Sequence, residues 1–146
     1  MLKQALVAVK QMSIRLGGVK VVSDLSFSIH HNEILGIVGE SGSGKTVTSL
    51  ALMGLVPRPG RVAGGRALFR GDDLLNMDGR RLAETRGRRI AMIFQDPMTS
   101  LNPVFTVGFQ LMEPLRKHMG LSHAGARGRA GELLDLVGLE VLYQAE

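Results

Sequence analysis

Within the first thirty positions of the chain, an apolar run at residues 6–9 passes into alternating apolar and polar residues at residues 12–16, and residues 25–30 alternate again. Alternation is the pattern of strands with one buried face. The alternation predicts a strand over residues 6–16 and another over residues 19–29, joined by a tight turn at Gly17 and Gly18. A third, shorter strand is predicted over residues 62–69. The first half of the chain is therefore expected to contain a sheet.

Two short runs contain no charged or polar side chain, residues 34–38 and residues 90–94. Runs of this length are typical of fully buried strands, such as those in the centre of a parallel sheet. Asn32 tolerates a left-handed backbone and is expected to close the turn into the first run. Both runs are thus predicted to be strands in the interior of the protein.

Helical segments are predicted between and after these strands. Residues 47–56 are expected to form an apolar helix, and Asp78 is expected to cap a short helix that ends near Arg86. Thr106 and Ser122 are predicted to cap two further helices, each with an apolar stripe. The predicted fold class is therefore α/β.

The composition is that of a folded protein, with 45% hydrophobic and 21% charged residues. A chain of 146 residues is long enough for one domain with its own core. The absence of cysteine excludes disulfides, thiolate metal sites and cysteine nucleophiles. The apolar runs are too short to span a bilayer and no signal peptide is recognised, so a cytoplasmic location is expected.

The net charge of +5 is unevenly distributed, because nine of the 13 arginines lie between Arg58 and Arg89. Such a cluster can mark a nucleic-acid-binding protein. However, aromatic residues make up only 4% of the chain, and no nucleic-acid-binding motif accompanies the arginines. We therefore interpret the cluster as a solvated face with some affinity for anions, and we expect no nucleic acid partner.

The most specific chemical motif follows the first apolar run. Residues 39–46 fit the pattern G-x-x-x-x-G-K-[ST] at every fixed position, between a predicted strand and a predicted helix. Glycines allow successive N–H groups to turn towards an anion, and a helix N-terminus adds partial positive charge. Lys45 is predicted to reach the β- and γ-phosphates of a nucleotide, and the Thr46 hydroxyl to bind Mg²⁺. The candidate nucleotide-binding residues are Gly39, Glu40, Ser41, Gly42, Ser43, Gly44, Lys45 and Thr46.

A second stretch points to a family. The loop Gly-Glu-Ser-Gly-Ser-Gly-Lys-Thr resembles the Walker A motif of ABC transporter ATPases. Residues 92–103, Met-Ile-Phe-Gln-Asp-Pro-Met-Thr-Ser-Leu-Asn-Pro, resemble the Q-loop region of the branch that imports oligopeptides, dipeptides and nickel. The resemblance extends over about residues 6–139. The chain is therefore similar to the ATP-binding subunit of an ABC importer.

The resemblance implies a P-loop NTPase fold of the ABC nucleotide-binding type. An antiparallel β-subdomain and the P-loop part of the parallel core would take about residues 1–105, and the start of a helical subdomain about residues 106–146. The family's LSGGQ-like signature and Walker B strand have no counterpart in these residues, so a truncated domain, the N-terminal part, is expected. Without those motifs we expect weak nucleotide binding and negligible hydrolysis.

The resemblance also implies a function, the coupling of ATP binding and hydrolysis to the import of peptides or similar small solutes. It assigns catalytic roles to Lys45 and Gln95, and Mg²⁺ ligation to Thr46 and Gln95. The implied cofactors are ATP and Mg²⁺. The implied partners are transmembrane permease subunits, a second ATPase subunit in a head-to-tail dimer and, indirectly, a periplasmic solute-binding protein. The implied location is the inner face of the plasma membrane, as a peripheral subunit.

One position departs from the family pattern. In ABC ATPases an aromatic residue near the end of the first strand stacks on adenine, and the alignment places Leu16 there. Ile14 and Arg15 are its neighbours, and no Phe or Tyr is near. Adenine is therefore expected to be held by contact with aliphatic side chains or with Arg15.

Two other interpretations stay open at this point. The chain could be a non-catalytic nucleotide-binding or interaction module that has lost hydrolysis. It could also be a nucleic-acid-linked P-loop protein that uses the arginines between Arg58 and Arg89.

Overall fold

The computed structural model describes residues 5–94 and 101–139 of the chain. The protein divides into two compact units, Met1–Arg86 and Gly87–Glu146. The first unit contains the sheet, and the second contains a pair of helices. The division that the resemblance implies, near residue 105, concerns the whole ABC domain and stays a prediction.

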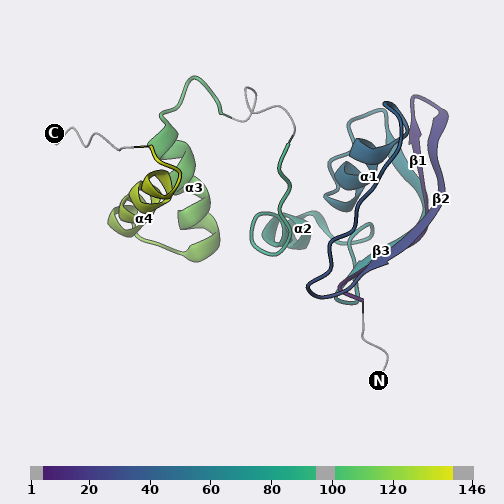
Figure 1. The fold of residues 1–146 in the computed structure, drawn as a ribbon, viewed down its shortest axis with the longest axis horizontal. Helices are drawn as coiled ribbons and strands as arrows, with labels where there is room; N and C mark the ends of the chain where they lie inside the picture. The colour runs from purple at the N-terminus through teal and green to yellow at the C-terminus, as the bar shows by residue number, and fades with distance from the viewer. Residues whose placement is uncertain (1–4, 95–100, 140–146) are drawn as a thin grey trace. The chain divides into compact units, whose positions relative to one another are not determined.

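The first unit is built on a four-stranded antiparallel sheet with the strand order β2-β1-β3-β4 (Figure 1). The first three strands confirm the three strands predicted in this part of the chain, and a turn at Arg70 and Gly71 leads into the last one. The strands are β1 (Val7–Leu16), β2 (Val19–Ile29), β3 (Arg61–Phe69) and β4 (Asp72–Asp73).

One face of this sheet carries the core of the first unit. Val9, Met12 and Ile14 of β1 are each at most 1% exposed. The spacing of Val9 and Met12 breaks strict alternation, and a β-bulge at Gln11, with a φ of +49°, accommodates it. Because a bulge inserts one extra residue into a strand, Met12 returns to the buried face.

The helix after the candidate phosphate loop is α1 (Lys45–Leu52), which begins earlier and ends earlier than predicted. It packs on β1 and β3. The Arg86 guanidinium holds its C-terminal end, with Nε donating to the Met53 carbonyl at 2.6 Å and Nη2 to the Gly54 carbonyl at 3.1 Å. A cation in this place satisfies carbonyl groups that have no partner within the helix.

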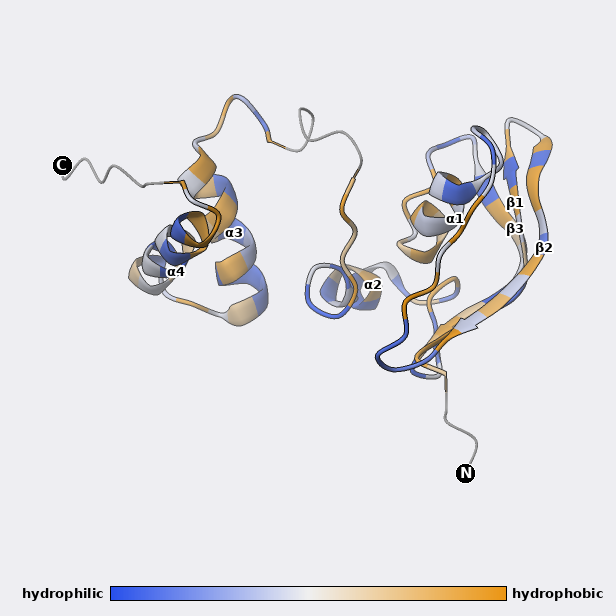
Figure 2. Ribbon diagram, in the orientation of Figure 1, coloured by the Kyte–Doolittle hydropathy of each residue, from blue (hydrophilic) through white to orange (hydrophobic). Residues whose placement is uncertain are grey.

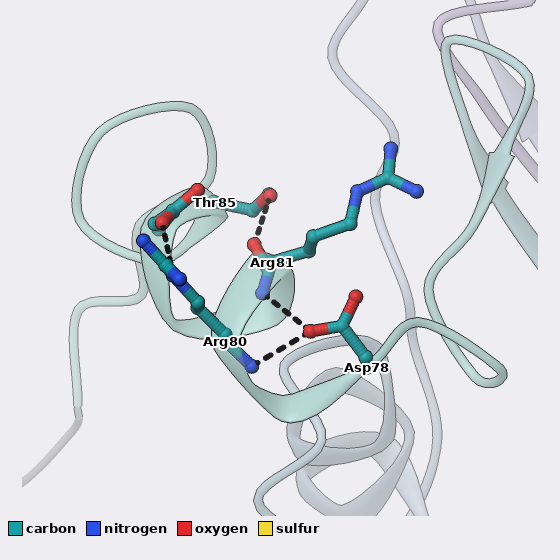
Figure 3. A network of polar contacts seen from close by, with 5 residues as sticks. Asp78, Arg80, Arg81 and Thr85 are labelled. Carbon is teal, nitrogen blue, oxygen red and sulfur yellow. Dashed lines mark hydrogen bonds and ion pairs between the residues drawn. The ribbon is translucent and has the colours of Figure 1, made fainter.

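The second helix, α2 (Gly79–Thr85), has the cap that the sequence predicts. The carboxylate of Asp78 accepts hydrogen bonds from the backbone N–H groups of Arg80 and Arg81, both at 3.0 Å (Figure 3). Near the end of the same helix, the Thr85 hydroxyl donates to the Arg81 carbonyl at 2.9 Å. These bonds fix both ends of a helix too short to be stable alone.

Replacement of Asp78 by alanine should destabilise this part of the protein by about 1 kcal/mol, since an N-cap side chain contributes about 0.5–2 kcal/mol. Hydrogen exchange at the Arg80 and Arg81 amides measures the loss directly. The Asp78→Asn variant keeps an acceptor oxygen and should exchange much more slowly than Asp78→Ala. Equal exchange in the two variants would show that the cap contributes nothing.

The second unit consists of α3 (Val107–Met119) and α4 (His123–Leu136), which pack against each other. Both predicted caps are confirmed. The Thr106 hydroxyl accepts from the Phe109 N–H and the Ser122 hydroxyl from the Gly125 N–H, each at 3.2 Å.

Small residues let these two helices pack closely. Ala126 and Ala130 of α4 are buried together with Leu115 of α3. The partly buried hydrophobic residues around them are Leu111, Met112, Leu121 and Leu133. Within residues 5–94 and 101–139, no helix is long and apolar enough to cross a membrane.

The two apolar runs are not strands, so the prediction of buried strands over residues 34–38 and residues 90–94 is wrong for this structure. Ile34 and Val38 are both 98% exposed, and Ile93 is 97% exposed. In Figure 2 both runs are drawn as coil in the orange of hydrophobic residues.

The reason lies in what a strand needs. A parallel strand in a sheet interior is held by hydrogen bonds to a neighbour on each side. Within the described residues, the ladders join only β1, β2, β3 and β4. The second run has a single isolated bridge position, Ile90, whose carbonyl accepts from the Gly87 N–H at 2.9 Å across a tight turn, and the first run has none. An apolar run indicates that a segment can be buried. It forms a buried strand only where a neighbouring strand is present to pair with it.

Candidate functional site: a phosphate-binding loop

The loop at residues 39–46 lies between an extended segment and the N-terminus of α1. Two of its glycines have left-handed backbone geometry, with φ of +80° at Gly42 and +94° at Gly44. Residues with a Cβ rarely adopt this geometry. The loop therefore has the sharp turns that aim backbone N–H groups into one concave surface.

Close packing fixes the loop against β2. A Cβ on Gly44 would lie 2.7 Å from Val22 Cγ2 and 3.2 Å from the Val21 carbonyl oxygen. A Cβ on Gly39 would lie 2.8 Å from Ser43 Oγ. Glycine is thus required at position 44 by contact as well as by backbone geometry, whereas the contact at Gly39 is with a serine hydroxyl that can rotate away. The sequence pattern places Val22 in a predicted strand, but nothing local indicates that it supports a loop twenty-two residues further along.

Lys45 lies with its ammonium group inside the loop. Its Nζ donates to the Gly39 carbonyl at 2.7 Å and to the Glu40 carbonyl at 2.6 Å, and lies 3.4 Å from Ser43 Oγ. The side chain therefore bends back over the loop, where a phosphate group would meet it. A cation held at a ring of backbone groups is suited to bind an anion as a point charge.

The N-terminus of α1 adds to the positive character of the site. The first N–H groups of a helix have no partner within it, and they carry about half a unit of positive charge. The residue before the helix, Gly44, has no side chain to cap them, and the first turn contains no acidic residue. These N–H groups are thus available to an anion, which is the arrangement of phosphate sites at helix N-termini.

Thr46 is in the first turn of α1, and its side chain is exposed. Its hydroxyl is free to bind a metal ion beside the phosphates. In the part of the chain that the structure describes, no group of three or more His, Asp or Glu could hold a metal ion by itself. Nucleotide-bound Mg²⁺ needs no such group, because phosphates and water supply most of its ligands. The loop and Thr46 therefore fit a magnesium–nucleotide complex.

The structure brings together all eight predicted loop residues, and it orients Lys45 towards their carbonyl groups. Gln95, the other predicted catalytic and Mg²⁺-binding residue, lies outside the described residues. Its role stays a prediction.

Leu16 and Arg15, the two candidates for adenine contact, face opposite sides of the sheet. Arg15 lines a polar groove on the exposed face. Leu16 lies next to Gly60, where a Cβ would clash with its Cδ2. Because side chains alternate along a strand, Leu16 shares the face of Ile14, whose partner Val22 supports the phosphate loop. Leu16 is therefore on the side of the phosphate loop, and Arg15 is not.

The turn before the extended segment contains a carboxylate that responds to pH. Asn32 closes this turn with a φ of +60°, as predicted. Glu33 accepts a hydrogen bond from the His30 N–H at 2.5 Å, and it lies 3.0 Å from His30 Nδ1. The backbone hydrogen bond from His30, followed by the contact with its ring, lowers the pKa of Glu33 below its ordinary value of 4.5.

A lowered carboxyl pKa sets the direction of the pH effect. The turn should be fully stabilised above pH 4.5, and it should lose that stabilisation as the pH falls through the lower folded pKa. An NMR titration of the His30 amide should show a midpoint below 4.5, and the Glu33→Gln variant should show no such step. A midpoint at or above 4.5 would contradict the hydrogen bond.

Comparisons with known proteins identify the family of the chain. Residues 22–144 match the family described as ABC transporter. The chain is 48% identical to the dipeptide transport ATP-binding protein DppD of Haemophilus influenzae over 139 residues, which is 92% of this chain and 42% of that protein. It is 53% identical to the oligopeptide transport ATP-binding protein OppD of Salmonella typhimurium over 121 residues, or 83% of this chain and 36% of that protein. The chain thus spans about two fifths of the length of these relatives.

A solved structure shares the fold. The ATP-binding cassette MJ0796, in a dimer bound to ADP and Pi, superposes with a TM-score of 0.74 at 22% sequence identity. The match covers 96% of this chain and 63% of that one. At this level of identity, the likeness is one of fold.

Proposed function

Because the chain belongs to the ABC transporter family, we propose that it forms the ATP-binding part of an importer subunit for peptides or similar small solutes. The observation that carries this proposal is the loop at residues 39–46, with Lys45 directed into it and the free N-terminus of α1 behind it. The names of the relatives DppD and OppD support the peptide class of solute.

We assign the roles in the site from the geometry of the loop and, for Gln95, from the resemblance to the family alone. Backbone N–H groups of the loop and of the first turn of α1 bind the phosphates, and the Lys45 ammonium exchanges its carbonyl partners for phosphate oxygens. Thr46 and Gln95 hold Mg²⁺. When bound, Mg²⁺ neutralises charge that develops on the transferred phosphoryl group.

Adenine is held by aliphatic contact with Leu16 rather than by Arg15. The position of Leu16 on the loop side of the sheet supports this choice. An aliphatic side chain offers area but no stacking, so selectivity for the base is expected to be low. The ratio of the affinities for ATP and GTP measures this selectivity.

Hydrolysis and transport belong to the larger assembly. Phosphoryl transfer needs a residue that orients or deprotonates water, and these 146 residues contain no Walker B carboxylates or signature motif. The proposed partners are transmembrane permease subunits, a second ATPase subunit and, indirectly, a periplasmic solute-binding protein. The proposed location is the inner face of the plasma membrane.

Isothermal titration calorimetry of the purified chain tests the proposal. One equivalent of ATP should bind in the presence of Mg²⁺, and chelation of the metal should weaken binding. Hydrolysis should stay at the background rate. A chain that folds but binds no ATP at millimolar concentration would refute the nucleotide site. Turnover that depends on Lys45 would refute the expectation of negligible hydrolysis.

A further inference from the structure

The exposed face of the β1–β2–β3 sheet carries an unusual distribution of charge. These three strands contain six charged residues, of which five are basic and one, Asp24, is acidic. The basic residues are Lys10, Arg15, Lys20, Arg61 and Arg66.

The register of the strands places like charges opposite one another. Arg15 of β1 pairs with Lys20 of β2 on one side and with Arg61 of β3 on the other, and Lys10 pairs with Arg66. Like charges directly opposite each other on a sheet repel and destabilise it. The row of Lys20, Arg15 and Arg61 crosses three neighbouring strands at spacings of about 4.8 Å.

This row lines a groove of about 600 Å³. The groove also contains Gln11 and Ser13, and its floor at Gly64 and Gly65 has no side chains. Within the described residues, Lys20 forms an ion pair with Asp24 at 3.4 Å, whereas Arg15 and Arg61 form none. Two of the three cations in the row are therefore without a carboxylate partner.

We propose that this groove binds an oligophosphate, a chain of phosphate groups that lies along the row formed by Lys20, Arg15 and Arg61. Guanidinium groups form paired hydrogen bonds with phosphate oxygens, and a chain of phosphates presents charges in a line, as the row does. The lining is polar apart from Ala63 and the two glycines, so it offers little to an apolar ligand. It contains no aromatic side chain on which a base could stack.

The proposed site is separate from the phosphate loop. The loop contacts Val22, which lies on the buried face of the sheet, whereas the groove is on the exposed face. An oligophosphate could be inorganic or could be the phosphate chain of a nucleotide. Both kinds of ligand would contact the groove through their phosphate oxygens. They differ in that a nucleotide also carries a nucleoside, which can change the affinity.

Binding of inorganic tripolyphosphate to the Lys45→Ala chain, in which the phosphate loop is weakened, tests the proposal by calorimetry. Binding should persist in this background. Adding Arg15→Gln and Arg61→Gln to the Lys45→Ala chain should weaken the binding of tripolyphosphate about tenfold or more. This double change removes both guanidinium groups that have no carboxylate partner. ATP titrated into the same proteins shows whether a nucleoside adds to or subtracts from the affinity.

In a matched control, two basic residues of the same sheet face that lie outside the groove are replaced, so that the net charge falls by the same amount. The pair Lys10→Gln with Arg66→Gln lies outside the groove and should change the affinity by less than about twofold, since exposed charges at a distance are screened. Asp24→Asn should tighten binding about two- to fivefold, because it removes one repulsive charge. Thermal melts of the two double variants should show midpoints no lower than that of the parent, because each removes two like charges that face each other across the sheet.

Three outcomes would overturn the proposal. Binding that disappears with Lys45→Ala alone would belong to the phosphate loop. An equal loss in the two double variants would be an effect of net charge. Weaker binding after Asp24→Asn would place the anion elsewhere. A variant that fails to fold is replaced by the single change Arg61→Gln, for which about a threefold loss or more is expected.

Discussion

Replacing Lys45 by alanine should weaken the binding of ATP about 10- to 150-fold, with little effect on the stability of the chain. A hydrogen bond to a charged group is worth about 1.5–3 kcal/mol, and the ammonium group is the only cationic side chain in the loop. Its present partners, the carbonyls of Gly39 and Glu40, belong to exposed residues and can bind water instead. Calorimetric titration with ATP and Mg²⁺, together with a urea melt, separates the two effects.

A lysine outside the loop sequence supplies the control for this experiment. Lys117 is exposed on α3, in the second unit, and Lys117→Ala removes the same charge without changing a loop residue. ATP affinity should be unchanged in this variant within about twofold. If Lys45→Ala and Lys117→Ala weakened ATP binding equally, Lys45 would act only through the net charge, and the phosphate-loop assignment would fail.

Replacing Gly65 by alanine should destabilise the first unit by about 2–5 kcal/mol. Gly65 has a φ of +91°, which costs a residue with a Cβ about 1–2 kcal/mol. A Cβ there would also lie 2.5 Å from the Gln11 carbonyl oxygen and 2.5 Å from Met12 Cα, and such overpacking adds about 1–3 kcal/mol. Both contacts are with backbone, so a rotamer change cannot relieve them. Urea unfolding followed by circular dichroism measures the loss.

The neighbouring glycine provides a close control. Gly64 has no left-handed φ, and a Cβ there would meet nothing within 4 Å. Gly64→Ala should therefore change the free energy of unfolding by less than about 0.5 kcal/mol. Similar losses in the two variants would show that neither the left-handed φ nor the contact with β1 at Gly65 decides the effect.

The hairpin of β1 and β2 could be predicted because its information is local. The alternation of apolar and polar residues in β1 and β2 indicates one buried face. The turn at Gly17 and Gly18 brings the two strands together within a few residues. The caps Asp78, Thr106 and Ser122 could be predicted for the same reason, since a cap bonds only to the next two or three residues. The predicted family and fold class are confirmed by the comparisons.

Features that depend on distant partners could not be predicted in this way. The apolar runs at residues 34–38 and residues 90–94 indicate burial, but a strand forms only beside another strand. The bulge at Gln11 and the contact between Gly44 and Val22 also join residues far apart in sequence. Within the site, the motif gives the identity of Lys45 and Thr46, whereas the support of the loop by β2 appears only in three dimensions.

That support has a consequence for synthesis of the protein. The phosphate loop rests on Val22 and precedes α1, which packs on β1 and β3, so all of its supports lie within Met1–Arg86. A chain leaving the ribosome N-terminus first can complete this unit while later residues are still being added. Cellular ATP that binds the nascent chain would stabilise it by mass action. The free energy of unfolding of the first unit would then rise with the concentration of ATP before the later residues are complete.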